Sequence, residues 1–559
     1  MSCTYLAVLC LTITSGLNQS TAQLGLRDSA YLNIKINNDT TTEVQNEEQI
    51  IMNPKDSTNL VAVWRDFRVG YRQVAYGYSF DGGLTWGQDL FIEPQYIWDS
   101  DPGLTVDTAG HFYAVILSYF STSQPNGLFV YKSTDGGASW TGPVTVINNA
   151  PDVFEDKELI ACDRSGGPYT DNLYVPWTRF GMTTEILMCR STDGGNSFVG
   201  PVTISDATGV QWSVPCVGPN SEVYVAWVEY NPARMRFDRS FDGGQTFGGD
   251  ITIQNVSDAS RYINGAILVF SFPAIDVDIT AGPYDGYIYV AYMDDAPGST
   301  DTDIYFTRST DGGTTWSQKV RINDDPLNNG CDQFHPWLTV ASDGSVIVVF
   351  LDRRNDPANL LMDLYMTTST DGGNTWLEND RISTVSCDPT AGSDFVDSIK
   401  HRINTNAPMI LAHRAGLLGE YIGVTASSID DIHPIWTDTR MGNQDIFVGV
   451  LDTSGTGINE HAFTVMNAAV LSVSPNPGRG QVAINIYIPR HIKQSSRAEL
   501  AIHDISGRLV NAFEVNLSAV PLTIYWNLHH AKGNSIGTGV YFCTLSVGKA
   551  IISTKFVIF

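Results

Sequence analysis

Acidic side chains recur two residues after the aromatic residue of successive apolar runs, at Asp66, Glu229, Asp294, Asp352 and Asp438. Three of them continue to an arginine two residues later, in Asp66-Phe67-Arg68, Asp352-Arg353-Arg354 and Asp438-Thr439-Arg440. Carboxylates and guanidiniums gathered on one face can bind a carboxylated sugar through bidentate pairs. The alternative is that each Asp braces its own loop by pairing with the nearby Arg. Repetition favours bracing, because catalytic groups need not recur along a chain.

A second set of polar and aromatic residues stands immediately before short buried segments. Its members are Asp99, Asp101, Glu155, Asp156, Lys157, Trp212, His335, Glu420 and Tyr421. A funnel mouth lined in this way can hold a sugar by stacking and hydrogen bonding, whereas each residue taken singly can also be a strand end or a loop contact. His335 precedes Pro336, and we expect it to be structural. Adjacent residues on a strand point to opposite faces, which argues against Glu420 and Tyr421 acting as a pair.

Six octets of the form Ser-x-Asp-Gly-Gly-x-Ser/Thr-aromatic organise the chain around these residues. They are Ser79–Trp86, Ser133–Trp140, Ser191–Phe198, Ser240–Phe247, Ser309–Trp316 and Ser369–Trp376. The hydroxyl and carboxylate can hold the backbone of a tight turn, the glycines permit positive φ, and the aromatic ring packs beneath. Each octet is therefore predicted to be a self-braced hairpin tip, with structural aspartates at Asp81, Asp135, Asp193, Asp242, Asp311 and Asp371.

Near-continuous apolar runs precede the octets and read as strands buried on both faces. They are Leu60–Trp64, Phe112–Ile116, Leu173–Trp177, Val223–Trp227, Ile288–Tyr292 and Val346–Phe350, with a seventh copy at His433–Trp436. Four short strands recurring about every 50 to 70 residues are typical of a β-propeller. We predict an all-β fold with seven blades, closed by Tyr31–Ile36 as the outer strand of the seventh. A six-bladed ring with an accessory hairpin is the alternative. Ligands are expected on the face opposite the octets.

The octets resemble the Asp-box, or bacterial neuraminidase repeat, of sialidases and related propeller proteins. The resemblance covers roughly Val44 to Asp452 and implies a sialidase-like propeller in which the box is a structural turn. A sialidase also needs an arginine triad, a Tyr with a neighbouring Glu, and an acidic residue as acid/base. Its first arginine opens the first blade, where this chain reads Glu47-Glu48-Gln49, so the catalytic pattern is not carried over.

A different composition begins after residue 464, with alternating strands at Val482–Ile488, Ala498–His503 and Thr523–Trp526. This stretch resembles the C-terminal sorting domain of type IX secretion. The resemblance rests on Ser474-Pro475-Asn476-Pro477, Asp504-Ile505-Ser506-Gly507-Arg508 and Gly539-Val540-Tyr541-Phe542. It implies an immunoglobulin-like β-sandwich, a double-membraned bacterium, and recognition by the outer-membrane secretion machinery. An ordinary accessory sandwich is the alternative.

The boundaries that follow are a signal peptide at 1–22, a propeller at 23–455 and a sorting-type sandwich at 465–559. The signal peptide is predicted from the apolar run Tyr5–Ile13 and the small residues at Ser20-Thr21-Ala22. No other stretch is long and apolar enough for a transmembrane segment. The mature chain is therefore expected to be secreted or held at the cell surface.

Composition limits the partners and cofactors of the chain. Its 60 acidic and 33 basic residues give a net charge of -27, which disfavours nucleic acid. No cofactor is predicted, since His-x-x-x-His, Cys-x-x-Cys and phosphate-loop patterns are missing from the sequence, and calcium at acidic loops is the alternative. A disulfide between Cys331 and Cys387 is expected, with free buried thiols as the competing interpretation.

Taken together, the sequence predicts an exported propeller that binds glycans or surface polysaccharide. The alternatives are an exo-glycosidase of sialidase type with a diverged site and a surface scaffold that binds other proteins.

Overall fold

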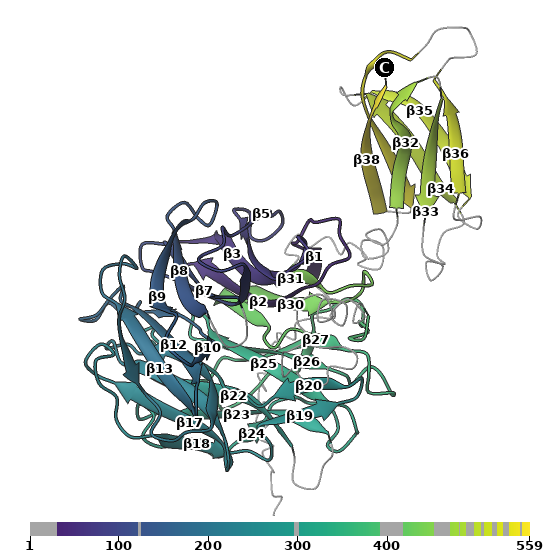
Figure 1. Cartoon of the computed structure of the whole chain (residues 1–559). Helices are drawn as coiled ribbons and strands as arrows, with labels where there is room; N and C mark the ends of the chain where they lie inside the picture. Colours follow the sequence, from purple (N-terminus) through teal and green to yellow (C-terminus); the bar gives the residue numbers. More distant parts are fainter. Residues whose placement is uncertain are drawn as a thin grey trace, which may run out of the picture.

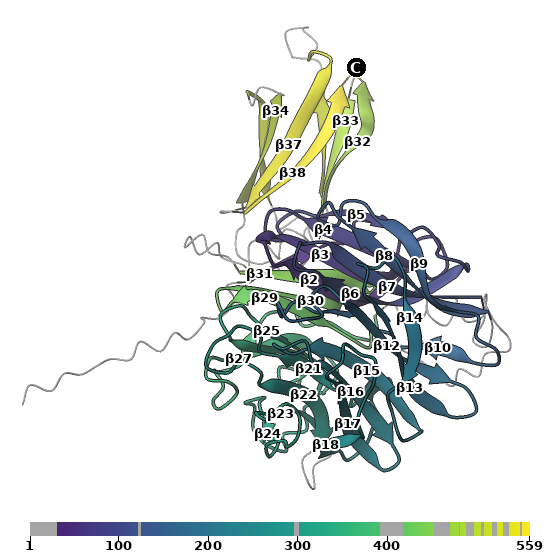
Figure 2. The same ribbon diagram turned by 90° about the vertical axis from the view of Figure 1, so that its left-hand side faces the viewer.

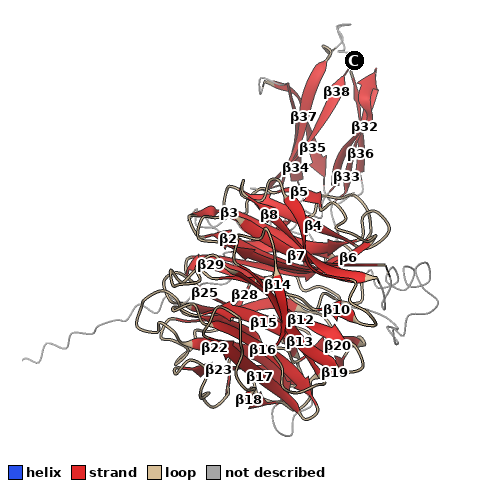
Figure 3. Ribbon diagram, turned by 60° about the vertical axis from the view of Figure 1, so that its left-hand side comes forward, coloured by secondary structure: helices blue, strands red, loops and turns tan. Residues whose placement is uncertain are grey.

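The computed structural model describes residues 31–120, 125–295, 301–391 and 418–451, together with seven segments of the C-terminal region. These segments are 470–479, 481–487, 497–504, 508–516, 522–528, 536–547 and 550–558. The predicted signal peptide lies outside the described residues. Every regular element in the described ranges is a β-strand, as predicted (Figure 3). None of the described segments contains a helix that could cross a membrane.

Seven sheets of four or five strands follow one another along the described part of residues 31–451. The first sheet consists of β2 (Gln45–Asn53), β3 (Asp56–Asp66), β4 (Gln73–Ser79) and β5 (Gly87–Leu90). The second consists of β6 (Trp98–Val106), β7 (Phe112–Tyr119), β8 (Asn126–Ser133) and β9 (Thr141–Asn148). The third consists of β10 (Phe154–Asp156), β11 (Ala161–Cys162), β12 (Leu173–Phe180), β13 (Thr184–Ser191) and β14 (Val199–Thr203).

The next three sheets keep the same antiparallel order. They consist of β15 (Val210–Val217), β16 (Val223–Tyr230), β17 (Ala233–Ser240) and β18 (Ile251–Asn255); of β21 (Ala274–Val277), β22 (Ile288–Asp295), β23 (Thr302–Ser309) and β24 (Val320–Arg321); and of β25 (Gln333–Val340), β26 (Val346–Asp352), β27 (Asp363–Ser369) and β28 (Asp380–Arg381). A separate hairpin, β19 (Ser260–Ile263) and β20 (Ile267–Phe270), lies between the fourth and fifth sheets in the chain.

The last sheet joins the two ends of this region. It consists of β29 (Gly423–Ser428), β30 (Asp431–Asp438), β31 (Asp445–Leu451) and β1 (Tyr31–Lys35). The antiparallel register runs from Tyr31 opposite Leu451 to Lys35 opposite Phe447, so the predicted pairing of the N-terminal strand with the last repeat is confirmed. Figure 1 shows the sheets arranged around a centre in chain order, and β2 contacts both β6 and β29. The result is an all-β, propeller-like fold.

The middle strands form the core because each sheet is covered on both faces by its neighbours. Their apolar residues are almost wholly buried, as the near-continuous runs predict, and Trp64, Trp177, Trp227 and Trp436 are among the largest fully buried side chains. The indole nitrogens of Trp64 and Trp436 donate to the carboxylates of Asp66 and Asp438, both at 2.9 Å. Asp66 and Asp438, two of the acids that follow the buried aromatic residues, therefore accept the hydrogen bond of a buried indole N–H.

The octets have the hydrogen bonds that the sequence predicts. In the first, Ser79 Oγ accepts the Gly83 N–H at 2.9 Å and donates to Asp81 Oδ1 at 2.8 Å. The same carboxylate accepts the N–H and the hydroxyl of Thr85, at 2.9 and 2.6 Å. The pattern recurs in all six octets. In the fourth octet, partial burial by itself raises the pKa of Asp242. The equivalent hydrogen bonds there outweigh this effect and bring the pKa down to about 2.

The second glycine of each octet also lies against the preceding sheet. A Cβ on Gly137 would approach Val61 to 2.5 Å, and one on Gly373 would approach Phe306 to 2.5 Å. Both glycines have positive φ, 90° and 78°. The octet therefore fastens one sheet to the next as well as closing its own hairpin.

Cations from the preceding sheet complete this fastening. The residue just before the octet serine is basic in four repeats, and each of these side chains donates to a glycine carbonyl of the next octet. The donors are Lys132, Arg190, Arg239 and Arg308, and the acceptors are Gly194, Gly244, Gly312 and Gly372. Arg308 also donates to Asn374 Oδ1, at 2.6 Å.

Replacing Arg308 by alanine is expected to lower the free energy of unfolding by about 1–2 kcal/mol, because a carbonyl between two sheets loses a charged donor. Urea unfolding of the full chain measures the change. Lys55→Ala, in an exposed turn, is the control and should change the free energy by less than about 0.5 kcal/mol. Equal effects of the two substitutions would contradict an inter-sheet role.

The C-terminal region forms one further sheet system of seven strands, in the order β35-β34-β37-β38-β32-β33-β36 (Figure 2). The strands are β32 (Val470–Arg479), β33 (Gln481–Tyr487), β34 (Arg497–Asp504), β35 (Leu509–Asn516), β36 (Leu522–Asn527), β37 (Gly539–Val547) and β38 (Ala550–Ile558). Its core includes Ile484, Leu500, Leu545 and Phe556, all fully buried. The three strands predicted here are present within one residue of their expected ends.

The expected disulfide between Cys331 and Cys387 is wrong. Both are free thiols, and Cys387 is buried where its backbone pairs with that of Met362. Cys331 is half-buried ahead of β25. Proximity to the same repeat in sequence does not bring two Cβ atoms to the short separation that a disulfide requires.

Candidate functional site

The structure separates the predicted site residues into loop braces and a central group. Arg68 donates to both carboxylate oxygens of Asp66, at 3.0 and 2.7 Å, and to Gln88 of the outer strand β5. Arg354 pairs in the same way with Asp352, and Arg440 with Asp438. All three guanidiniums are thus bound to acceptors of the protein itself, in their own loops and in neighbouring segments.

Glu155 also belongs to the loop braces rather than to the central group. Its carboxylate accepts the Trp177 indole N–H at 2.6 Å and pairs with Arg179 at 2.5 Å, which repeats the Trp–acid–Arg arrangement of Asp66. Asp99 is fully buried in β6, and burial raises its pKa to about 8, so it is protonated at neutral pH. Neither side chain presents a free charge to a ligand.

The central group arises from one irregularity repeated in the innermost strands. The pairing register of β2, β6, β15 and β25 shifts at Glu47, Asp101, Trp212 and His335. These residues have positive φ values of 57°, 52°, 67° and 47°, and Lys157, which directly follows β10, has 57°. Positive φ is uncommon for residues with a side chain and is concentrated at functional or strained sites.

When the seven sheets are aligned on their buried middle strands, the position equivalent to Asp101 supplies one residue from each sheet. We call Glu47, Asp101, Lys157, Trp212, Phe272, His335 and Tyr421 the axial ring. Phe272 and Tyr421 stand just before β21 and β29 in the same alignment. Within the described ranges, each side chain of the axial ring is at most 9% exposed.

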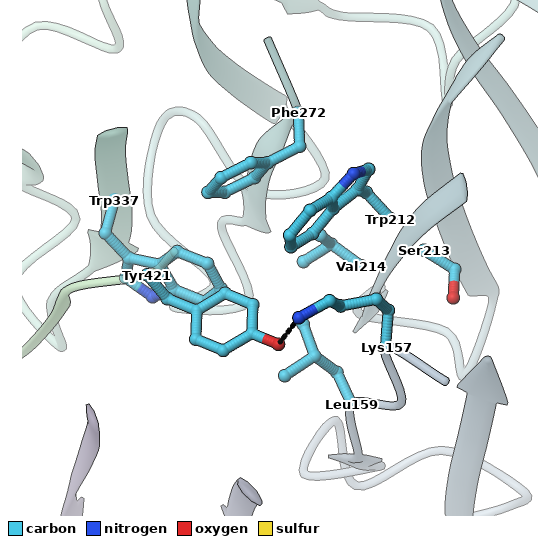
Figure 4. A pocket seen from close by; sticks show the side chains of 8 residues that line it. All are labelled: Lys157, Leu159, Trp212, Ser213, Val214, Phe272, Trp337 and Tyr421. Atoms are coloured by element: carbon cyan, nitrogen blue, oxygen red, sulfur yellow. Dashed lines mark hydrogen bonds between the residues drawn. The ribbon is translucent and has the colours of Figure 1, made fainter. Parts of the chain in front are cut away.

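Lys157 holds the polar half of the axial ring together. Its Nζ lies 2.5 Å from Asp101 Oδ2, contacts Glu420 Oε2, and lies 3.4 Å from the Tyr421 hydroxyl (Figure 4). It also sits over the Trp212 ring, 4.7 Å from the centroid. Burial by itself lowers the pKa of Lys157, but Asp101 and Glu420 outweigh burial and raise it well above its usual value. Lys157 is therefore a buried, permanently charged ammonium.

Glu420 and Tyr421 both reach Lys157, so the expectation that they point apart is wrong. Both precede β29, which begins at Gly423, and the alternation of a regular strand does not apply to them. The Tyr421 hydroxyl also donates to Asp101 Oδ2 at 3.3 Å. One lysine, two carboxylates and one phenol form a single connected cluster.

Two residues that the sequence analysis did not propose for the site, Glu47 and Phe272, complete the axial ring. Glu47 pairs with Arg65 at 2.7 Å, and burial raises the pKa of Glu47 to about 8 against the effect of Arg65. Phe272 stacks on Trp212 with ring centroids 5.2 Å apart. An alignment of the innermost strands places Glu47 and Phe272 level with Asp101. This alignment is the one sequence signal that could have identified them.

The remaining predicted residues lie beside this cluster. His335 is 6.1 Å from Phe272 by ring centroids, and burial lowers its pKa to about 3, so the imidazole is neutral. Asp156 precedes Lys157, and burial raises its pKa to about 7 despite the nearby ammonium. His335 is thus a buried member of the axial ring, and Asp156 is a half-buried neighbour of Lys157.

The space at the axial ring is small. Lys157, Trp212, Phe272, Trp337 and Tyr421 are among the residues that enclose a cavity of about 10 Å³, the room that one water molecule needs (Figure 4). A sugar ring does not fit into it. Among the described cations near the axial ring, Lys157 and Arg65 are each paired with a carboxylate, whereas Arg72 donates to the Tyr119 hydroxyl.

An aromatic pair, one ring half-buried and the other exposed, lies on the same face. Trp98, which opens β6, stacks on Phe120 with centroids 6.0 Å apart and the rings within 8° of parallel. Phe120 is 58% exposed, and Ile97 beside it is 41% exposed. Trp98 stands opposite Tyr119, at the end of the sheet that carries Asp99 and Asp101, whereas the octet follows Ser133 at the other end.

Comparison with known proteins identifies the C-terminal region. Residues 472–559 match the family described as the secretion system C-terminal sorting domain. The chain therefore carries this domain, which directs export through type IX secretion and implies contact with its machinery. None of the curated protein sequences matches the chain significantly.

Solved structures of two sialidase-type enzymes and a polysaccharide lyase resemble the chain at low identity. The Hadza microbial sialidase Hz136 is 15% identical over 55% of this chain and 63% of its own, with a TM-score of 0.39. The intramolecular trans-sialidase from Ruminococcus gnavus is 13% identical over 62% and 95%, with a TM-score of 0.42. A PL25 ulvan lyase is 10% identical over 76% and 96%, with a TM-score of 0.46.

At TM-scores below 0.5 these similarities assign neither an activity nor a ligand to this chain. The chain is an all-β, propeller-like protein with a type IX secretion sorting domain at its C-terminus, and it is exported to the cell surface or the medium.

Proposed function

We propose that this exported protein binds a glycan on the face opposite the octets, and that it does so without cleaving the glycan. The observation that carries the proposal is the exposed ring of Phe120, stacked near-parallel on the half-buried Trp98 on that face. Flat aromatic surfaces that remain exposed are suited to stacking on sugar rings. The neighbouring axial ring is filled and neutralised, which makes it a support for this face rather than a pocket.

Hydrolysis of sialidase type has little support from the geometry. Asp101, which accepts the Tyr421 hydroxyl, and Glu420, which adjoins Tyr421 in the chain, are both bound to Lys157. A carboxylate that serves as nucleophile or acid must reach the glycosidic bond, which these two do not. Glycan binding without cleavage therefore fits the site better than an exo-glycosidase.

We further infer that the seven sheets are the blades of a closed seven-bladed propeller and that the tail is an immunoglobulin-like sandwich. The contact between β2 and β29, together with the β1–β31 pairing, supports the closed ring. The proposed boundaries remain 1–22, 23–455 and 465–559.

A glycan array with the full chain tests the proposed function. Phe120→Ala and Trp98→Ala should each weaken binding about tenfold, which corresponds to roughly 1.4 kcal/mol. Phe80→Ala is the matched control, because Phe80 is 54% exposed but lies in the first octet on the other face. A fluorogenic sialoside should stay intact in the same preparation. Turnover of the sialoside, or binding that neither substitution reduces, would overturn the proposal.

A further inference from the structure

A second opening lies on the octet face, beside the fourth octet. It measures about 400 Å³, within the range of small-ligand sites and far larger than the central cavity. Its lining includes Asp238 and Arg239 at the end of β17, Phe241 in the octet, and Phe247, Gly248 and Gly249 after it. We call it the fourth-octet groove.

The sequence around this groove departs from the other five repeats. Two residues before the octet serine, the others carry Gly77, Tyr131, Cys189, Thr307 and Thr367, where this repeat carries Asp238. Two consecutive glycines follow the octet aromatic only here. Compared with the other five repeats, this repeat therefore has an additional carboxylate before the octet and smaller residues directly after it.

Within the described ranges, one oxygen of the Asp238 carboxylate accepts hydrogen bonds from the protein and the other does not. Its Oδ1 accepts the N–H groups of Arg239 and Gly248, at 2.7 and 3.1 Å. Its Oδ2 is buried and has no partner within the described ranges, and the residue is 1% exposed. Burial raises the pKa of Asp238 to about 6 although these two N–H groups lower it. Leaving a carboxylate oxygen buried without a donor costs free energy, so a ligand that supplies a donor is favoured.

Phe241 offers an exposed aromatic surface in the lining of the same groove. It is 67% exposed, and the Arg239 guanidinium lies over its ring, 5.3 Å from the centroid. Arg239 is itself fixed to the Gly312 carbonyl and, at 3.1 Å, to Thr314 of the next octet. Phe80, at the equivalent position of the first octet, instead lies against Gly136 of the next sheet.

The charge around the groove restricts the ligand. Asp242 lines it, and Asp206 and Asp250, which bind each other's backbone N–H groups, adjoin Gly249. Arg239 and Arg236 are already committed to neighbouring acceptors. Anionic ligands are therefore repelled, while a flat, uncharged molecule rich in hydroxyl donors fits.

We propose that the fourth-octet groove binds a neutral saccharide ring, which stacks on Phe241 and donates a hydroxyl hydrogen to Asp238 Oδ2. This site lies on the opposite face from Trp98 and Phe120, and it does not depend on the function proposed for that pair. Gly248 and Gly249 leave room for the ring beside the backbone.

Saturation-transfer NMR of the full chain with neutral pyranosides, and with glucuronic acid as the charged comparison, tests this site. We expect millimolar binding of at least one neutral pyranoside, with contacts on one ring face and no comparable signal from glucuronic acid. Asp238→Asn replaces Oδ2 by a donor while keeping an oxygen for the two N–H groups, and it should weaken binding at least tenfold. Phe241→Ala should do the same.

The controls separate this site from the face proposed above. Phe80→Ala and Phe120→Ala should leave neutral pyranoside binding at the fourth-octet groove unchanged, and the urea midpoint of Asp238→Asn should match that of the parent chain. Absence of binding by every neutral pyranoside at millimolar concentration overturns the proposal. So does binding that Asp238→Asn leaves intact, or preferred binding of glucuronic acid.

Discussion

Replacing Lys157 by methionine is expected to lower the free energy of unfolding by about 3–5 kcal/mol at neutral pH. Methionine keeps the length of the side chain but removes the ammonium that Asp101 and Glu420 share. Two buried carboxylates then lose the ammonium that binds them both. Urea unfolding at pH 7, followed by far-UV circular dichroism, measures the loss.

Two further variants show whether charge is the cause. Adding Asp101→Asn and Glu420→Gln to Lys157→Met removes the uncompensated charges and should recover most of the stability. Lys55→Met is the control, because Lys55 lies in an exposed turn, and it should change the free energy of unfolding by less than about 0.5 kcal/mol. If the triple variant is no more stable than Lys157→Met, packing rather than charge holds the cluster.

Lowering the pH should narrow the difference between Lys157→Met and the parent chain. In the parent, burial raises the pKa of Asp101, but Lys157 and Arg65 hold it far below its usual value, so its stabilisation is lost only in strong acid. In the variant, the same carboxyl has a raised pKa in the folded state. Its destabilisation is therefore relieved as the pH falls and the carboxyl takes up a proton.

The stability of the propeller region should fall as the pH rises from about 6.5 to 8. Burial raises the pKa values of Glu48 and Asp99 to about 8, well above their values in an unfolded chain. The folded state therefore holds protons that the unfolded state has released, and each such group lowers stability by about 1.4 kcal/mol per pH unit in this window. His335, with a pKa lowered by burial to about 3, acts in the opposite direction only below about pH 6.5.

Glu48→Gln tests this pH dependence directly. The amide oxygen can still accept the Thr437 hydroxyl, which lies 2.8 Å from Glu48 Oε2, while the titrating group is gone. The slope of unfolding free energy between pH 6.5 and 8 should decrease by about 1.4 kcal/mol per pH unit. A variant that keeps the full slope, or a parent chain whose stability increases over this range, would contradict the assignment.

The elements that the sequence predicted best are those whose interactions are local. Each octet contains its own donors and acceptors, so Ser79, Asp81 and Thr85 indicate the turn without knowledge of any other segment. The buried middle strands are equally readable from their apolar runs. The Asp–Arg pairs behave as the bracing interpretation predicts, because both partners lie within three residues of one another.

The axial ring was predictable only in part. Asp101, Lys157, Trp212 and Tyr421 stand out as polar or aromatic residues before buried segments. Glu47 does not, because its role depends on where the pairing between β2 and β3 slips, and that register is set by tertiary contacts. Trp98 was missed for a similar reason, since its contact with Phe120 depends on the pairing of β6 with β7.

The pairing of β1 with β31 bears on how the protein is made. The ribosome releases β1 early, and its partner emerges only after almost all of the seven sheets have been translated. The sorting domain at residues 472–559 follows still later. A truncated product that lacks β31, and so exposes unpaired strand edges, consequently also lacks the domain that directs type IX export.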